Sequence, residues 1–296
     1  MDAPLHIEIR QARSGFEGFF GSWVVLGPNN VVVDTGPASS AGNLVAGLEA
    51  LGLKRVDWVL LTHIHIDHAG GLAAVLARYP EAKAVCHAAG LRFLADPTRL
   101  WAGSQKVLGE LAEFYGRPDS VPAERLVPHD SMAFNGLQIV ETPGHAPHHL
   151  SYRLRGRIYA GEAGGNLLKV QGHPYLRPAT PPRFFLPEAL ASVDRLLDLD
   201  DQPIHYAHFD QAESSKEMLG RFRRQLLRWC DIVSGVLIEG EDEVEARCIA
   251  ALLQGDPELA AFHYMDQTVR TRERSFMANS VRGYLGYLKE QAQAPE

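Results

Sequence analysis

Short apolar runs bounded by turn residues alternate with helix-like stretches along most of the chain. Runs of this length beside glycine, proline or asparagine are typical of strands, and apolar residues spaced three or four apart are typical of helices. The pattern predicts strands within residues 5–26 and at 31–33, 56–61, 82–87, 137–140, 157–160 and 204–208, with helices at 41–52, 71–79, 97–115 and 187–199. Strands that alternate with helices in this way predict an α/β fold.

Two dipeptides in the middle of the chain predict hairpins. Asn135-Gly136 lies between the apolar segments 132–134 and 137–140, and Asn-Gly is a strong signal for a two-residue turn between strands. Arg155-Gly156 precedes the predicted strand at 157–160, so we expect a second hairpin at that point.

From Glu213 onward the apolar residues follow a helical period throughout. Ser214 and Glu217 match a capping box, which marks the start of a helix. The apolar faces comprise Leu219, Phe222, Leu226, Trp229, Cys230 and Val233, then Met277, Val281, Tyr284, Leu285 and Leu288. Such faces have to be buried, so we expect this tail to cover a cleft or to form a homodimer contact. We therefore predict one domain at residues 1–212 and a helical extension at 213–296.

Composition and charge narrow the class of protein. Hydrophobic residues make up 46% and charged residues 22% of the 296 residues, which is typical of a globular protein with a sizeable core. The formal net charge of −7 argues against nucleic acid as a partner. No apolar run reaches the length of a membrane span, and no segment looks like a secretory signal. The three scattered cysteines fit reduced thiols, so we expect a cytoplasmic protein.

Metal-competent side chains are concentrated in the stretch from Thr62 to Gly71. His63 and His65 alternate with isoleucines, so both imidazoles project to the same side of an extended backbone. Asp67 and His68 follow where the chain turns toward a helix, at the end of a buried strand, which is a common place for chemistry. Imidazole and carboxylate without thiolate suit zinc, iron or manganese. This pattern predicts a metal site rather than a solvated loop that happens to be rich in histidine.

Further metal-competent side chains also stand at the ends of predicted strands, namely His145, Glu162 and His208. Strand ends along the same edge of packed sheets could gather them, whereas a single helix could not. Asp34 also follows a predicted strand, and it either orients a metal-bound histidine or caps a turn. His87 ends another strand, where a lone histidine is more often packed than a metal ligand.

On these motifs the chain resembles the metallo-β-lactamase-fold hydrolases. The leading motif of that superfamily is matched by residues 62–71, and its other motifs are matched in order by Asp34-Thr35-Gly36, Thr142-Pro143-Gly144-His145, Gly161-Glu162 and His208. The resemblance spans about residues 5–210, and the turn from Thr142 to His149 is most similar to the glyoxalase II-like branch. It implies an αββα sandwich with metal ions at one edge between two sheets, to which this chain adds its helical extension.

The resemblance also implies a ligand set for two divalent ions, with zinc expected first and iron or manganese as alternatives. One ion would be held by His63, His65 and His145, and the other by Asp67, His68 and His208, with Glu162 at the bridging position. Asp67 would orient a bridging hydroxide and could shuttle its proton. The reaction implied is hydrolysis of a thioester, lactone or other ester in a small-molecule substrate.

The chain departs from the family at Glu162, because the bridging position usually carries aspartate. The longer side chain changes how two ions would be bridged. Ala207 also replaces the glycine that usually precedes the last histidine. His149 matches a supporting histidine of the glyoxalase II-like branch. The remaining histidines of interest, His148 and His205, have no such match and are predicted to be loop or packing residues.

Two alternatives stay open from sequence. Related proteins of this fold use one iron on two histidines and an aspartate to oxidise persulfides, so a mononuclear iron persulfide dioxygenase is the first. The second is a non-catalytic metal-binding scaffold whose helical tail contacts a partner. Substrate contacts are not defined, since loops vary freely on such scaffolds. The residues considered for a pocket, each predicted to be an ordinary loop or surface residue, are His173, Tyr175, Arg177, Phe184, Phe185, Arg270 and Arg274.

Overall fold

The structure is a computed structural model that describes residues 3–208 and 210–293. Its backbone contacts divide the chain into two units. Unit 1 comprises Met1–Glu141 and His148–Tyr159, and unit 2 comprises Thr142–Pro147 and Ala160–Glu296. The predicted domain boundary after residue 212 stays a prediction, and the outer ends of the two predicted domains, residues 1 and 296, lie outside the described residues.

Unit 1 is built on a six-stranded sheet whose strands lie in sequence order. The strands are β1 Leu5–Glu8, β2 Gly21–Val25, β3 Val31–Val33, β4 Trp58–Leu60, β5 Lys83–Cys86 and β6 Leu126–Pro128. β1 to β3 pair antiparallel, whereas β3 to β6 pair parallel and are connected through helices that include α1 Ala41–Ala50 and α3 Leu72–Arg78. Parallel strands are covered on both faces, which explains why β3 is apolar at every position.

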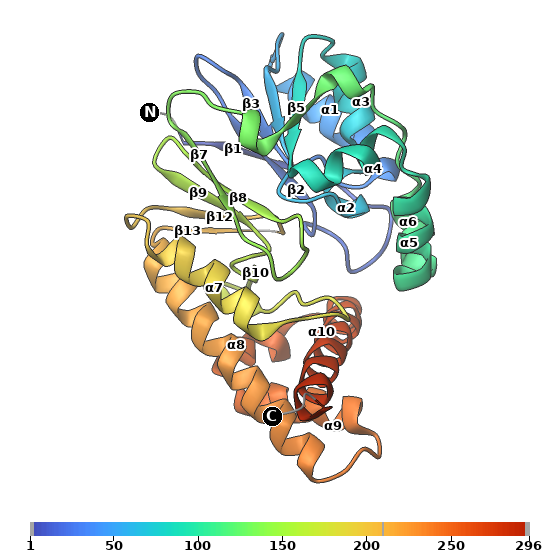
Figure 1. The fold of residues 1–296 in the computed structure, drawn as a ribbon, viewed down its shortest axis with the longest axis vertical. Coiled ribbons are helices and arrows are strands. Elements are labelled where there is room, and N and C mark those ends of the chain that lie inside the picture. Colours follow the sequence, from blue (N-terminus) through green and yellow to red (C-terminus); the bar gives the residue numbers. More distant parts are fainter. Residues whose placement is uncertain (1–2, 209, 294–296) are drawn as a thin grey trace. The chain divides into compact units, whose positions relative to one another are not determined.

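A second sheet has some of its strands in unit 1, and these pack on the first sheet. Its strand order is β13-β12-β9-β8-β7, with β7 Leu137–Glu141, β8 Leu150–Leu154, β9 Arg157–Gly161, β12 Ile204–Tyr206 and β13 Gln211–Ala212. Within unit 1, Val33, Leu60 and Val85 of the first sheet share one buried core with Leu150 and Tyr152 of β8. Figure 1 shows α1 and α3 on the other face of the first sheet. The predicted α/β sandwich with a helical C-terminal region is confirmed.

The prediction of a single helix over 97–115 in unit 1 is wrong. Instead of a single helix over 97–115, α5 Thr98–Leu108 ends and α6 Glu110–Tyr115 begins on either side of Gly109, whose φ of 56° is incompatible with a continuous helix. The other short helices of this unit are α2 Ile66–Ala69 and α4 Leu91–Ala95, with 3-10 turns at Ala38–Ser40, Ala88–Gly90, Ala123–Arg125 and His129–Ser131.

Only one of the two predicted hairpins forms. Arg155 and Gly156 join β8 to β9, and their φ values of 52° and 72° match the turn type that fits the twist of paired strands. The hairpin at Asn135-Gly136 is wrong, because residues 132–134 form no strand. Met132 and Phe134 instead pack against the sandwich core, so their apolar character is satisfied by packing rather than by strand pairing.

Unit 2 contains a hairpin that sequence analysis missed. β10 Asn166–Val170 and β11 His173–Arg177 pair antiparallel around Gln171-Gly172, where both residues have positive φ. Tyr175 and Arg177 were expected to be ordinary loop or surface residues, but they are 1% and 2% exposed. The hairpin escaped notice because its strands carry adjacent leucines and a proline instead of a clear apolar–polar alternation.

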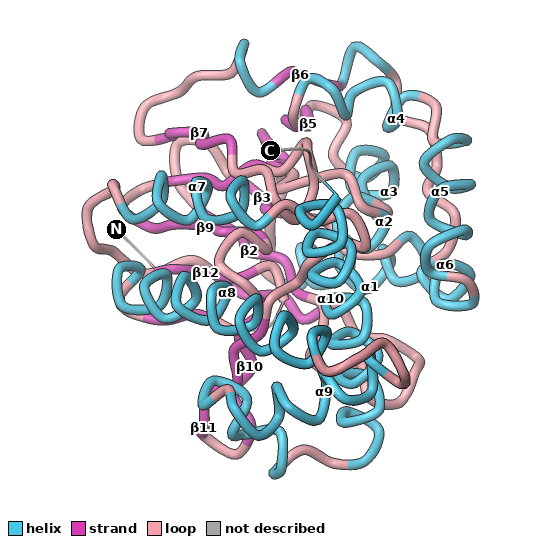
Figure 2. The backbone as a smooth tube through the Cα atoms, turned by 60° about the horizontal axis from the view of Figure 1, so that its bottom comes forward, coloured by secondary structure: helices cyan, strands magenta, loops and turns pink. Residues whose placement is uncertain are grey.

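The helices of unit 2 pack on one another (Figure 2). They are α7 Leu186–Leu197, α8 Ser215–Ile238, α9 Val244–Gly255, a 3-10 helix at Pro257–Tyr264 and α10 Gln267–Gln293. Ser214 caps α8 by accepting the Glu217 N–H at 3.1 Å, as the capping box predicts. α8 contacts α7, α9 and α10, and buries Trp229 completely. Among the described residues, no helix combines the length and the apolar character needed to cross a bilayer.

Candidate metal centre

The histidine-rich stretch of unit 1 follows β4 and is fastened to β8. The Thr62 carbonyl accepts the Leu150 N–H at 2.7 Å, and the Leu61 carbonyl accepts the Tyr152 hydroxyl at 2.6 Å. Burial of the tyrosine raises its pKa, so the hydroxyl remains a donor. These bonds hold the backbone of the stretch where it leaves the sheet.

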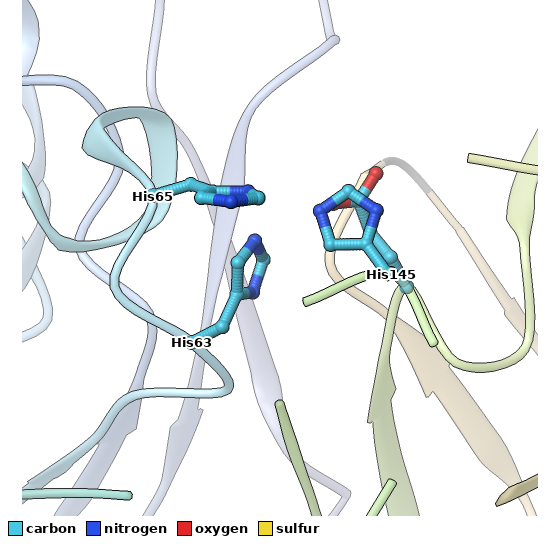
Figure 3. A group of neighbouring side chains, drawn as sticks. His63, His65 and His145 are labelled. Atoms are coloured by element: carbon cyan, nitrogen blue, oxygen red, sulfur yellow. The ribbon is translucent and has the colours of Figure 1, made fainter. Parts of the chain in front are cut away.

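The two isoleucines of the stretch determine which way its histidines point. Ile64 and Ile66 are each 1% exposed, because they project into the core. Since side chains alternate along an extended backbone, His63 and His65 project to the opposite side. Their ring centroids lie 4.5 Å apart, and Figure 3 shows both rings leaving the same segment toward one side. The predicted common direction of the two imidazoles is therefore present in unit 1.

Asp67 and His68 join this pair from the first turn of α2. The His68 N–H donates to the His65 carbonyl at 3.0 Å, which turns the chain immediately after the extended stretch. The His68 ring lies 4.1 Å from that of His63, and its Nε2 lies 3.6 Å from an Asp67 carboxylate oxygen. Unit 1 thus gathers the four predicted ligands of the leading motif.

Asp34 supports these histidines, which decides between its two predicted roles. Its Oδ1 accepts the Thr62 N–H at 2.8 Å, while its Oδ2 accepts the Thr62 hydroxyl at 2.8 Å and His68 Nδ1–H at 3.2 Å. A carboxylate only accepts hydrogen bonds, so His68 carries a proton on Nδ1. Asp34 therefore orients a histidine and does not merely cap a turn.

The same network determines the tautomer of His63. The Thr62 hydroxyl donates its proton to Asp34, so it accepts from His63 Nδ1 at 3.0 Å. With Nδ1 protonated in both His63 and His68, the neutral rings carry their lone pairs on Nε2. A metal-binding histidine typically has this arrangement, with one nitrogen donating to the protein and the other facing the ion. The donor set of unit 1 therefore fits a metal.

Two more histidines surround this group in unit 1. His149 is completely buried, with its ring 5.1 Å from that of His63. His148, predicted to be a loop or packing residue, has its ring 5.7 Å from that of His65. Both follow the 142–147 loop directly in sequence and return the chain to unit 1.

Unit 2 carries the remaining predicted ligands at the ends of three strands. His145 follows β7, Glu162 follows β9, and His208 follows β12. His145 Nε2 lies 2.8 Å from Glu162 Oε2, and His208 Nε2 lies 3.6 Å from Glu162 Oε1. Figure 3 shows His145 on its loop. The structure thus brings the three predicted residues of unit 2 together around one carboxylate.

His145 also has the arrangement of a metal ligand. Its Nδ1 donates to the Ala179 carbonyl at 2.7 Å, while Nε2 faces the Glu162 carboxylate. Because both ring nitrogens face oxygen acceptors, a positive charge has to stand between Nε2 and the carboxylate. That charge is either a proton or a metal ion, so the donor set of unit 2 fits a cation.

A small cavity of unit 2 adjoins His145 and Glu162. It has a volume of about 20 Å³, which is room for one or two water molecules. Phe184, one of the residues considered for a pocket from sequence, lines it together with Phe222 and Leu226 of α8. The helical extension therefore forms part of the apolar surroundings of these two residues.

A third group in unit 1, formed by His87, His129 and Glu141, has the opposite tautomers. His87 Nδ1 accepts the Ala89 N–H and His129 Nδ1 accepts the Ala88 N–H, each at 3.1 Å. The neutral rings therefore carry their protons on Nε2, and His129 Nε2 donates to Glu141 at 2.9 Å. Burial, and then the stacked His129 ring, lower the pKa of His87. We assign no metal to this group.

Sequence reasoning missed two supporting residues. Thr62 links Asp34 to His63, and Asn166 donates from Nδ2 to Glu162 Oε1 at 3.2 Å. Thr62 lies within the motif, so its position was visible but its hydrogen bonds were not. Asn166 begins the missed hairpin, and only the adjacent glycines at 164–165 gave a signal that the chain turns there.

Comparison with known proteins places the fold in a family. A family model described as the metallo-beta-lactamase superfamily matches residues 18–208. The chain belongs to this superfamily. Its relatives include the metallo-beta-lactamase fold-containing protein ST1585 of Sulfurisphaera tokodaii. That protein is 25% identical to this chain, over 73% of this chain and 85% of its own length. A hydroxyacylglutathione hydrolase of Aeromonas hydrophila is 28% identical over 63% of this chain, which spans 59% of that enzyme.

Solved structures of the metallo-beta-lactamase superfamily match nearly the whole chain. The archaeal superfamily protein ST1585 from Sulfolobus tokodaii has a TM-score of 0.68 at 20% identity, covering 97% of this chain and 99% of its own. The superfamily protein TTHA1429 from Thermus thermophilus has a TM-score of 0.64 at 22% identity, covering 98% of this chain and 94% of its own. At these identities the likeness shows the fold and leaves the reaction to be argued from the site.

Proposed function

We propose that this metallo-beta-lactamase superfamily member is a metal-dependent hydrolase that cleaves a thioester, lactone or other ester of a small molecule. The observation that carries the proposal is the direction of three imidazoles. His63, His68 and His145 each donate from Nδ1 to an oxygen of the protein, which presents Nε2 for a metal ion. The hydroxyacylglutathione hydrolases among its relatives support ester-type chemistry.

The proposed ligands are the seven side chains identified from sequence. They are His63, His65 and His145 for one divalent ion, Asp67, His68 and His208 for a second, and Glu162 as a bridge. Zinc is the metal we expect first, with iron or manganese as alternatives, because nitrogen and oxygen donors suit all three. When bound, such ions lower the pKa of water toward neutrality and polarise a substrate carbonyl.

The protein residues supply orientation and proton transfer around that chemistry. Asp34 and Thr62 hold His63 and His68 in the required tautomer through hydrogen bonds of about 3 Å. The Asp67 side chain is 19% exposed, so its carboxylate can accept the proton of the attacking water and pass it to solvent. The Ala179 carbonyl accepts from His145 Nδ1 and so orients this imidazole, as Asp34 orients that of His68.

The test is a substrate panel on protein reconstituted with zinc, iron or manganese. We expect hydrolysis of thioesters or lactones, and we expect His65→Ala to lower both metal content and turnover because a ligand is lost. His263→Ala, at an exposed histidine of unit 2, is the matched control and should leave both unchanged. Oxygen uptake with a persulfide on the iron form, without hydrolysis, would replace the proposal with a dioxygenase. A metal-loaded protein inert toward the whole panel would favour a scaffold.

A further inference from the structure

Asn166 stands beside Glu162, the residue at which the chain departs from the aspartate that its resemblance implies. The Asn166 amide donates from Nδ2 to Glu162 Oε1 at 3.2 Å, and the two side chains are buried. A tight turn makes this contact. The Gly165 N–H donates to the Glu162 carbonyl at 3.0 Å, and Gly165 has a φ of 80° with Phe222 too close to admit a Cβ.

Hydrogen-bonding chemistry determines which end of the Asn166 amide faces the carboxylate. A carboxylate only accepts, so the amide nitrogen faces Glu162, and the reverse orientation would place two oxygens against each other. Asn166 Oδ1 is then buried with no hydrogen-bond partner within residues 3–208 and 210–293. A buried oxygen of this kind lowers stability. The amide therefore contributes through its N–H donor, and not through its oxygen.

Glu162 has a reason to need such a donor. Glutamate has one more methylene and one more torsion than aspartate, so its carboxylate can take more orientations on the same backbone. In the structure Oε1 receives the Asn166 N–H while Oε2 lies 2.8 Å from His145 Nε2. The hydrogen bond selects the orientation in which one carboxylate oxygen faces His145.

Asn166 is connected to the helical tail through its partner strand. Asn166 begins β10 and is paired in register with Arg177 of β11. Arg177 forms a buried ion pair with Glu273 of α10. The residue that holds Glu162 thus stands on a hairpin whose other strand is anchored to the last helix of the chain.

We propose that Asn166 is a positioning residue that adapts the longer Glu162 side chain to metal binding. The inference rests on the proposed function, in which Glu162 is a metal ligand. Its mechanism is specific to glutamate, because an aspartate on the same backbone would hold its carboxylate one methylene further from the amide. The effect of Asn166 must therefore depend on which acid occupies position 162.

The experiment is a double-mutant cycle on the full chain, with zinc alone as the probe. Metal-free wild type, Asn166→Leu, Glu162→Asp and the double variant are titrated with zinc against a chromophoric chelator. We expect Asn166→Leu to weaken zinc binding by about 10–100-fold, the usual effect of losing a residue that orients a ligand. In the Glu162→Asp background the same change should have little further effect. Thermal unfolding of the metal-free variants checks that Asn166→Leu keeps the fold.

Lys169→Ala, at an exposed position of the same strand, is the control and should bind zinc as wild type does. Unchanged affinity in Asn166→Leu, or an equal loss in both backgrounds, overturns the proposal. If Asn166→Leu does not fold, Asn166→Ala enters the same cycle with the same expectation. Wild type that binds zinc but hydrolyses nothing refutes the proposed function and leaves this inference standing, whereas wild type that binds no zinc refutes both.

Discussion

Asp34 shows how one side chain sets the chemistry of its neighbours without being a ligand itself. Its two oxygens accept from the Thr62 backbone, the Thr62 hydroxyl and His68 Nδ1. Its backbone φ of 57° lies in the left-handed region, which aspartate and asparagine tolerate better than most residues. An asparagine there keeps the backbone conformation but replaces one acceptor with a donor.

We therefore predict that Asp34→Asn folds normally but binds metal about 10–100-fold more weakly, because an amide N–H would face a donor of Thr62 or His68. Competition with a chelator measures the affinity, and circular dichroism checks the fold. Asp130→Asn, at an exposed aspartate of the same unit, is the control. If both variants retain wild-type affinity, Asp34 does not set the tautomers.

At the residue scale, the candidate ligands and the supporting carboxylate of Asp34 could be named from sequence, but the supporting roles of Thr62 and Asn166 could not. His63 and His65 are revealed by their alternation with buried isoleucines, a local pattern that survives folding. Asn166 becomes meaningful only through its contact with Glu162, and the hydrogen bonds of Thr62 depend on Asp34, far away in sequence. Such contacts form only in the folded chain, so no local sequence pattern reveals them.

At the element scale, the β10–β11 hairpin and α10 are joined by charges inside unit 2. Arg177 of β11 and Arg272 of α10 both pair with Glu273, and all three side chains are buried. Burial by itself would raise the pKa of Glu273, but the two guanidinium groups outweigh it and lower the pKa. Breaking a buried pair leaves an uncompensated charge, which costs far more than breaking a surface pair.

We predict that Glu273→Gln destabilises the protein by about 3–5 kcal/mol. Asp194→Asn, which breaks the exposed pair with Arg223, should cost no more than about 1 kcal/mol. Because the folded pKa of Glu273 is lowered, its contribution is complete above the unfolded pKa of about 4.3 and is lost progressively as the pH falls from there through the lower folded pKa. Urea unfolding at several pH values measures this, and equal stability of both variants would contradict it.

The β10–β11 hairpin shows which strands cannot be predicted from the apolar pattern of the sequence. β3 was predicted because a short continuous apolar run bounded by turn residues is typical of a buried strand. β10 and β11 lack that pattern, since their burial depends on contacts with α8 and the 257–264 helix, which lie far along the chain. Gly109 divides the helix predicted over 97–115 because its φ is positive. A glycine within a helical pattern is a sign of such a break, but the apolar spacing continues on both sides of it.

At the scale of the whole molecule, the helical tail is part of the folded core of unit 2 and not an appendage to it. α8 packs on α7 and β11, and Leu176 of β11 and Val193 of α7 are completely buried. Three of the four arginines of α8 pair with carboxylates of unit 2, namely Arg221 with Glu258, Arg223 with Asp194 and Arg228 with Asp256. The homodimer contact expected of the tail is tested separately, by the molecular mass of the full chain in solution.

We predict that ending the chain after Asp210 causes aggregation, because β11 and α7 lose their cover and Arg177 loses its buried partner. Size-exclusion chromatography with light scattering compares the shortened and full chains, and the full chain gives the oligomeric state in the same run. A shortened protein that remains soluble and monomeric would show that the tail is independent of the rest of unit 2.

We expect the seven proposed ligands to hold two metal ions. Elemental analysis of purified protein, after dialysis against zinc and removal of the excess, measures it most directly. We predict about two ions per chain for wild type and fewer for His65→Ala in the same preparation. One ion per wild-type chain would contradict the dinuclear site, and a folded wild type without bound metal would refute the proposed metal-dependent function.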